Sequence, residues 1–144
     1  MARLRRESDT LGLVSFGVFL IIAALVIINF PDIFSDVVLW FRSWEVGGPN
    51  MIPVNLIWPL IWFLAGNGIW SLALSGIRAV TGISRRKIIS DAFGGMYLIV
   101  ASFLFREYAV NLISLTIFLP GLVVALGAMI LLGAVTSYML HGRL

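Results

Sequence analysis

Four long apolar runs constrain this chain more than any other feature of its sequence. The first, residues 11–30, has no charged residue over about 20 positions, and an α-helix of that length matches a hydrocarbon core about 30 Å thick. Hydrophobic residues make up 60% of the 144 residues and charged residues 12%, far from the balance of a water-soluble domain. The solvent must therefore be lipid over most of the chain, and in lipid the backbone must satisfy its own hydrogen bonds, as helices do.

We predict an all-α integral membrane protein with a single polytopic domain over residues 1–144. The third apolar run has only about 14 uncharged residues, 92–105, so its flanking residues must complete the span, with Asp91 near the inner boundary. The last run is longer than a bilayer requires, and we expect Pro120 to begin its span, with residues 112–119 as a short outer segment or kinked extension. The four spans are predicted at about 11–30, 56–78, 88–109 and 120–140.

A short amphipathic helix is predicted between the first two spans, at residues 31–46. Apolar side chains recur there at helical spacing, while acidic, basic and hydroxyl side chains take the opposite face. We expect this helix to lie in the outer interface with its apolar face toward lipid, and the alternative is a helix packed on other protein. The inward residues would be Phe34, Val38, Phe41 and Trp44.

The basic residues indicate the orientation of the chain in a cell membrane. Most of them flank segments that would share one side: the N-terminus, the Arg85, Arg86 and Lys87 loop, and the C-terminus. Because cytoplasmic segments carry an excess of Lys and Arg, we predict that both termini and this loop are cytoplasmic.

Cysteine labelling in intact cells tests this orientation, and the chain has no cysteine of its own to interfere. We expect a membrane-impermeant thiol reagent to label Ser43→Cys and to spare Ser84→Cys. The reverse pattern would show that the orientation is inverted.

Small residues at helical spacing predict close helix packing on two spans. Lipid offers no hydrophobic drive between helices, so association depends on small side chains that let backbones approach and on hydrogen bonds between helices. We expect part of this surface to contact another chain. The candidate packing residues are Gly68, Ser71 and Ser75 on the second span, and Gly121, Ala125, Gly133 and Ser137 on the fourth.

The outer side holds one group of polar residues that could converge with Asp32 and Asp36. A charge near the bilayer is costly unless it reaches the headgroups or pairs, and we favour headgroup contact over a binding site for a ligand or partner. Arg106 should have an acidic partner, Glu107 or one of Asp32, Asp36 and Glu45, so that Arg106→Ala lowers thermal stability. The group consists of Arg42, Glu45, Arg106, Glu107 and Asn111.

No pattern typical of catalysis, cofactor binding or metal binding occurs in the sequence. The span interiors carry no ionisable residue, which argues against a proton relay and against an enzyme acting alone. The chain has no cysteine and one histidine, His141, so a metal bound by His141 would have no second histidine or cysteine ligand in the chain. The basic residues lie at span ends rather than along an extended surface, so nucleic acid is a poor partner.

Two functions remain open on this sequence. The first is a non-catalytic accessory or assembly subunit of a larger membrane complex, or a small homo-oligomer, with membrane lipid and other membrane chains or its own copies as partners. The second is a carrier or channel component that handles a lipid or small molecule, with a helix break at Gly66, Asn67 and Gly68 lining a cavity.

Overall fold

The structure is a computed structural model, and it describes the backbone of residues 2–45, 52–82 and 85–141 and the side chains of residues 11–43, 52–82 and 85–139. Within these ranges the chain forms helices and no strand, and all helices except the second are long and apolar enough to cross a membrane. The predicted all-α fold with four spans and a short helix after the first is confirmed. The helices are α1 (Ala2–Asn29), α2 (Ile33–Glu45), α3 (Val54–Thr81), α4 (Arg85–Ala109) and α5 (Leu115–His141).

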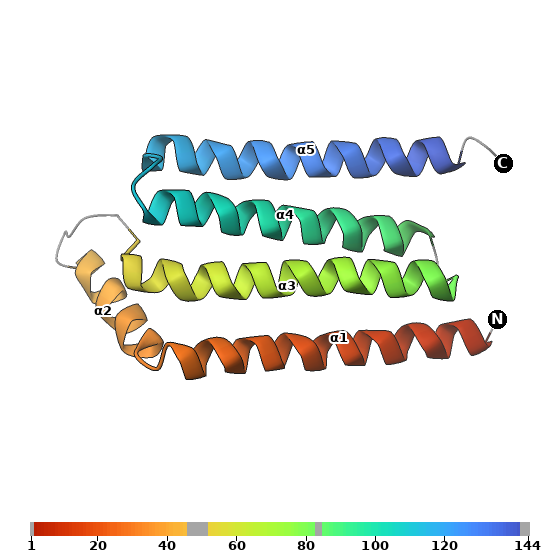
Figure 1. The fold of residues 1–144 in the computed structure, drawn as a ribbon, viewed down its shortest axis with the longest axis horizontal. Helices are drawn as coiled ribbons and strands as arrows, with labels where there is room; N and C mark the ends of the chain where they lie inside the picture. The colour runs from red at the N-terminus through yellow and green to blue at the C-terminus, as the bar shows by residue number, and fades with distance from the viewer. Residues whose placement is uncertain (1, 46–51, 83–84, 142–144) are drawn as a thin grey trace.

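The four spanning helices lie side by side in one row, in chain order α1, α3, α4, α5 (Figure 1). The contact between α3 and α4 is the most extensive, the contact between α4 and α5 is smaller, and the contact between α1 and α3 is the lightest. Between the described parts of other spanning helices there is no substantial contact. The domain is therefore one helix thick rather than a closed bundle, and α1 and α5 each have one spanning neighbour.

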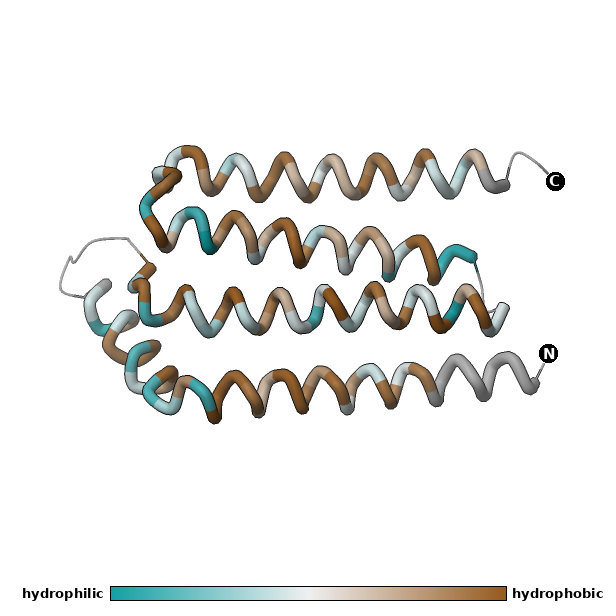
Figure 2. The backbone as a smooth tube through the Cα atoms, in the orientation of Figure 1, coloured by the Kyte–Doolittle hydropathy of each residue, from teal (hydrophilic) through white to brown (hydrophobic). Residues whose placement is uncertain are grey.

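The spanning helices all run between the same two faces of the molecule, and these two faces differ in charge and in the segments that they carry. The start of α1, the α3–α4 turn and the end of α5 lie at one end, and α2 and the α4–α5 connection lie at the other (Figure 1). Apolar residues fill the middle of each span, and polar residues gather toward the ends (Figure 2). We call the face that carries Arg78, Arg85, Arg86 and Lys87, at one end of each spanning helix, the basic end, and we call the opposite face the α2 end.

Two helix ends depend on a left-handed residue. Gly82 has φ +70° and its N–H donates to the carbonyl of Arg78, which ends α3. Asn111 has φ +58° and follows α4, where the N–H of Leu112 donates to the carbonyl of Glu107 at 2.9 Å. Asparagine tolerates this conformation better than most residues. Asn111 therefore has a role in chain reversal between α4 and α5.

Two helices start earlier than the predicted span limits. The basic residues at 85–87 form the first turn of α4 rather than a loop, because their long side chains reach water from a helical backbone at the membrane boundary. Pro120 does not begin the last helix, since α5 starts five residues earlier at Leu115 and runs through the proline. Residues 115–119 are therefore a helical extension, one of the two forms expected for residues 112–119. A proline near the start of a helix removes one backbone hydrogen bond without ending it, and Pro59 has the same place in α3.

The α3–α4 contact is built around two glycines. A Cβ atom on Gly68 would lie 3.0 Å from the carbonyl oxygen of Gly95, and a Cβ atom on Gly95 would lie 2.8 Å from the carbonyl oxygen of Gly68. Either distance is shorter than normal packing allows, so only glycine fits at both positions. The Cβ of Ser71 would lie 3.0 Å from a Cβ on Gly95, which places this serine in the same contact.

Helix α2 lies across the ends of the spanning helices that are opposite the basic end, and it packs on α3 (Figure 1). Ile33, Val37 and Trp40 line the space between α2, α1 and α3, so one apolar side of the helix faces protein. Phe34, Val38 and Phe41 are exposed, although Phe34 also lines this space. One apolar side of α2 thus faces protein, which is the alternative surroundings that the sequence left open, and contact of the exposed side chains with lipid stays a prediction. The Trp44 side chain lies outside the described residues.

Candidate functional site

The small residues of α5 face α4 within the same chain. A Cβ on Gly121 would meet the Leu104 side chain at 3.8 Å, and a Cβ on Gly133 would meet the Phe93 ring at 3.4 Å. Ala125 and Ser137 are half-buried at the same helical spacing. The predicted packing face therefore exists, but it packs inside the chain, so it is not the free surface that we expected for a partner.

We call the line of contact between two neighbouring helices a seam. The α4–α5 seam is filled by side chains at the α2 end and hollow at the basic end. Phe118 is 1% exposed, with its ring centroid 4.7 Å from that of Phe105 and 4.9 Å from that of Tyr108. Toward the basic end, α4 residues 86–97 and α5 residues 126–137 line a groove of about 490 Å³, which we call the α4–α5 groove. The glycines and alanine on its walls, Gly94, Gly133 and Ala134, leave this space unfilled.

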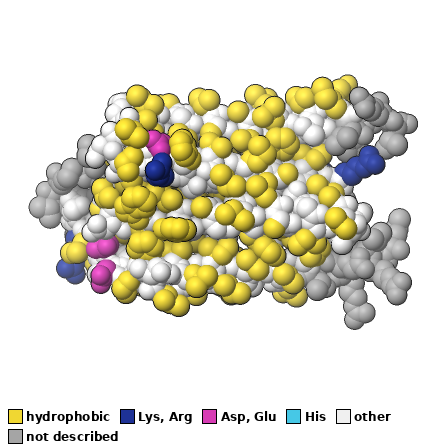
Figure 3. Space-filling model, viewed as in Figure 1, with side chains coloured by type: hydrophobic (Ala, Val, Ile, Leu, Met, Phe, Trp, Pro, Cys, Tyr) yellow, Lys and Arg dark blue, Asp and Glu magenta, His cyan; other side chains and the backbone are white. Residues whose placement is uncertain are grey.

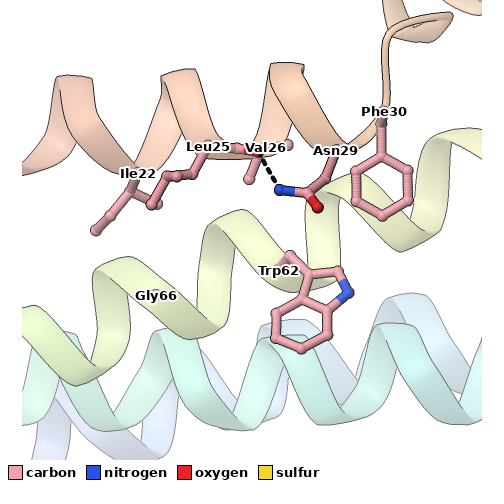
Figure 4. A pocket seen from close by; sticks show the side chains of 7 residues that line it. All are labelled: Ile22, Leu25, Val26, Asn29, Phe30, Trp62 and Gly66. Carbon is pink, nitrogen blue, oxygen red and sulfur yellow. Dashed lines mark hydrogen bonds between the residues drawn. The ribbon is translucent and has the colours of Figure 1, made fainter.

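A second hollow lies between α1 and α3. Its volume is about 460 Å³, and Ile22, Leu25 and Val26 of α1 line it together with Gly66 and Trp62 of α3. Figure 4 shows Asn29 and Phe30 at one side of it and the Trp62 ring pointing away from α1 in this view. The Asn29 side chain donates to the carbonyl of Leu25 at 2.7 Å, so its amide group remains bonded within the helix. Farther along the same seam the Trp70 indole N–H donates to Ser15 Oγ at 2.9 Å.

The predicted helix break at Gly66, Asn67 and Gly68 does not occur. α3 is continuous from Val54 to Thr81, and the Asn67 side chain donates to the carbonyl of Phe63 at 2.8 Å. Such a bond keeps a polar side chain on its own helix. Gly66 lines the α1–α3 hollow, whereas Gly68 faces α4, so the two glycines serve different seams.

The outer polar residues do not form one cluster. Arg106 Nη1 lies 3.0 Å from Glu107 Oε1, which provides the acidic partner that the sequence predicts for Arg106. Among the described side chains no ion pair joins this pair to Arg42 or to the acidic residues of α2. Figure 3 shows charged side chains in separate groups at the α2 end. The Glu45 side chain lies outside the described residues.

A smaller polar hollow of about 300 Å³ lies beside the start of α2. Asp32 and Asp36 line it together with Asn29, Asn55 and Trp58. The two acidic residues are predicted from the sequence to lie on the outer side, whereas Asn29 and Asn55 belong to different helices and have no sequence signal that joins them to this hollow. No group of three His, Cys, Asp or Glu side chains suited to a metal occurs in the described part of the chain.

One ion pair was not foreseen from the sequence. Arg78 of α3 and Asp91 of α4 form a hydrogen-bonded ion pair at the basic end, with side chains 11% and 23% exposed. The two residues lie at similar distances from the short α3–α4 turn, and this symmetry was the signal that could have identified them. The pair joins the two best-packed helices near the basic end.

The packing residues thus fall on three seams: Gly68, Ser71 and Gly95 between α3 and α4, the α5 residues against α4, and Gly66 toward α1. Ser75 is half-buried on α3. The side chain of His141 lies outside the described residues. Comparison of the chain with protein-family models, with curated proteins and with solved structures finds no match.

Proposed function

We propose that this chain is a non-catalytic membrane protein that works by lateral association, as an accessory or assembly subunit beside other membrane chains or beside its own copies. The one-layer row of spans supports this proposal. Four helices in a row make three seams, and α1 is held by the lightest of them. In lipid, helices are stabilised by close packing with neighbours, and each end of the row leaves a helix with one spanning neighbour.

The free side of α1 is the surface that we assign to a partner. Gly17 has no other part of the described chain within 4 Å of an added Cβ, so a second backbone can approach closely there. Exposed apolar side chains alone would not favour a protein partner, because lipid solvates these side chains equally well. Gly121 and Gly133 of α5, which were predicted for this role, already face α4.

Substitution of Gly17 tests the proposal. We expect Gly17→Ile to insert normally, because insertion depends on summed hydrophobicity, and to weaken association. Overpacking costs about 1–3 kcal/mol, which is roughly a 5- to 150-fold loss of affinity. Single-molecule photobleaching measures self-association in bilayers, and quantitative mass spectrometry after mild solubilisation measures stoichiometric partners.

The matched control is Gly76→Ile on α3, another helical glycine whose added Cβ meets nothing within 4 Å. It should leave association unchanged. A wild-type chain that is monomeric in bilayers and carries no stoichiometric protein would contradict the proposal. Equal loss of association in both variants would contradict the assignment to α1.

The α1–α3 hollow supports a second candidate, a role in handling an apolar lipid or small molecule. Its walls are apolar, and its volume is that of a small ligand site. Gly66→Leu would fill the hollow, because an added Cβ already lies 3.1 Å from the Ile22 side chain. A purified monomer that retains one defined apolar ligand, lost in Gly66→Leu, would favour this function over lateral association.

A further inference from the structure

The α4–α5 groove has the length of one bilayer leaflet. Its walls are two facing stripes, residues 86, 89, 90, 93, 94 and 97 of α4 and residues 126, 129, 130, 133, 134 and 137 of α5. Each stripe covers 11 helical steps, about 16 Å at 1.5 Å per residue. A hydrocarbon core is about 30 Å thick, so the groove runs from the membrane boundary at the basic end to about the bilayer midplane.

The shape of the groove favours a thin, flexible occupant over a protein helix. The aromatic contact of Phe118 with Phe105 and Tyr108 holds α4 and α5 together on the α2 side, so a helix could not follow the seam across the membrane. Toward the basic end, Gly94 has no other side chain within 4 Å of an added Cβ. An acyl chain fits a narrow apolar channel that stops near the midplane.

The charge at the mouth of the groove is positive. Arg86 lines the groove at its basic end, and exposed Arg85 and Lys87 flank it on the first turn of α4. None of the lining residues is acidic. Asp91, the acidic residue of this part of α4, pairs with Arg78 of α3 on the opposite seam. A guanidinium at headgroup depth binds a phosphate with charge-assisted hydrogen bonds.

We infer that the α4–α5 groove binds an anionic phospholipid from the leaflet at the basic end, with one acyl chain between residues 86–97 and 126–137 and the phosphate on Arg86. This site is separate from the free side of α1 that we assign to a protein partner. Gly121 and Gly133 of α5 allow contact with α4, and Gly94 on the facing wall leaves room for the acyl chain.

Lipid binding to the full-length chain tests the inference. Native mass spectrometry in mild detergent measures retention of phosphatidylglycerol and of phosphatidylcholine with the same acyl chains, and glycerol 3-phosphate serves as the headgroup without chains. We expect phosphatidylglycerol to be retained about fivefold better than phosphatidylcholine, because the trimethylammonium group of phosphatidylcholine cancels the charge of its phosphate and is repelled by the basic residues, and glycerol 3-phosphate not to be retained. A photoactivatable acyl chain should label α4 and α5.

Two variants and two matched controls separate a site from general surface attraction. Arg86→Gln and Gly94→Leu should each lower phosphatidylglycerol retention about tenfold, because one removes the phosphate contact and the other fills the channel. Arg85→Gln removes the same charge from outside the groove, and Gly76→Leu makes the same change on an open side of α3, so both should retain the lipid. Arg86→Gln alters an exposed side chain and should leave folding intact.

Three results would overturn the inference: equal retention of the two phospholipids, equal loss in Arg85→Gln and Arg86→Gln, or photolabelling confined to other helices. Retention of glycerol 3-phosphate at the level of phosphatidylglycerol would also overturn it, because the headgroup alone would then account for binding. Failure of lateral association leaves each of these readouts unchanged, so the two proposals are tested separately.

Discussion

Replacing Gly95 with alanine should destabilise the protein, whereas the same replacement at the neighbouring Gly94 should stabilise it. An added Cβ on Gly95 lies 2.8 Å from the Gly68 carbonyl oxygen, which belongs to a helix backbone and cannot rotate away. The two helices must separate, at an overpacking cost of about 1–3 kcal/mol. At Gly94 nothing lies within 4 Å of the added Cβ, so alanine there gains the helix propensity of about 0.5–1 kcal/mol that glycine lacks.

Thermal unfolding of the purified variants in one detergent measures this difference. The melting temperature should fall for Gly95→Ala and rise for Gly94→Ala, so a general effect of glycine substitution cannot explain both. Gly68→Ala should lower it as well, and the double variant Gly68→Ala/Gly95→Ala should lower it by less than the sum, because one separation of the helices relieves both clashes. A Gly95→Ala protein as stable as wild type would show that α3 and α4 are not in backbone contact.

The number of spans and the short helix between the first two were predictable from the sequence. Long apolar runs must form helices in lipid, because no other structure satisfies an isolated stretch of backbone there. The helix end at Gly82 was predictable for a local reason, since glycine adopts the left-handed conformation that the stop requires. The start of α5 was not, because the effect of Pro120 depends on whether a preceding turn of helix is stable.

The neighbours of each helix face were not predictable from hydropathy. A lipid-facing leucine and a protein-facing leucine look alike in sequence, so the small face of α5 gave no sign of whether its neighbour was another chain or α4. Gly133 in fact faces Phe93 of α4. Gly95 was missed for a related reason, because a glycine marks a close contact only when the opposing helix brings a second small residue to the same level.

For the polar residues too, features within one helix were predictable from the sequence, whereas contacts between helices were not. The sequence placed Asp91 near the inner boundary and Arg106 beside an acidic neighbour, because both follow from distance along one helix. The Arg78–Asp91 pair joins two helices, and its formation depends on the register that the short turn and the Gly68–Gly95 contact impose.

Breaking the Arg78–Asp91 pair should lower stability far more than breaking the Arg106–Glu107 pair. Asp91→Asn keeps the shape of the side chain but leaves the Arg78 guanidinium, 11% exposed, without its carboxylate at the edge of the membrane. The pair is part-buried, and leaving a part-buried charged group without its hydrogen-bond partner costs about 1–3 kcal/mol. Arg106 is 56% exposed and lies one turn from the end of α4, where it reaches headgroups, so Arg106→Gln should cost about 1 kcal/mol or less.

A double-mutant cycle separates the pair from its surroundings. Arg78→Gln and Asp91→Asn should each lower the free energy of unfolding, and the double variant should recover much of the loss, because neither charge is then left unpaired in apolar surroundings. Denaturation in one detergent at fixed pH measures all four proteins, with Arg106→Gln as the exposed-pair control. If Asp91→Asn costs no more than Arg106→Gln, or if the single losses add without coupling, the pair does not hold α3 and α4 in register, and the Gly68–Gly95 contact alone sets the geometry of this seam.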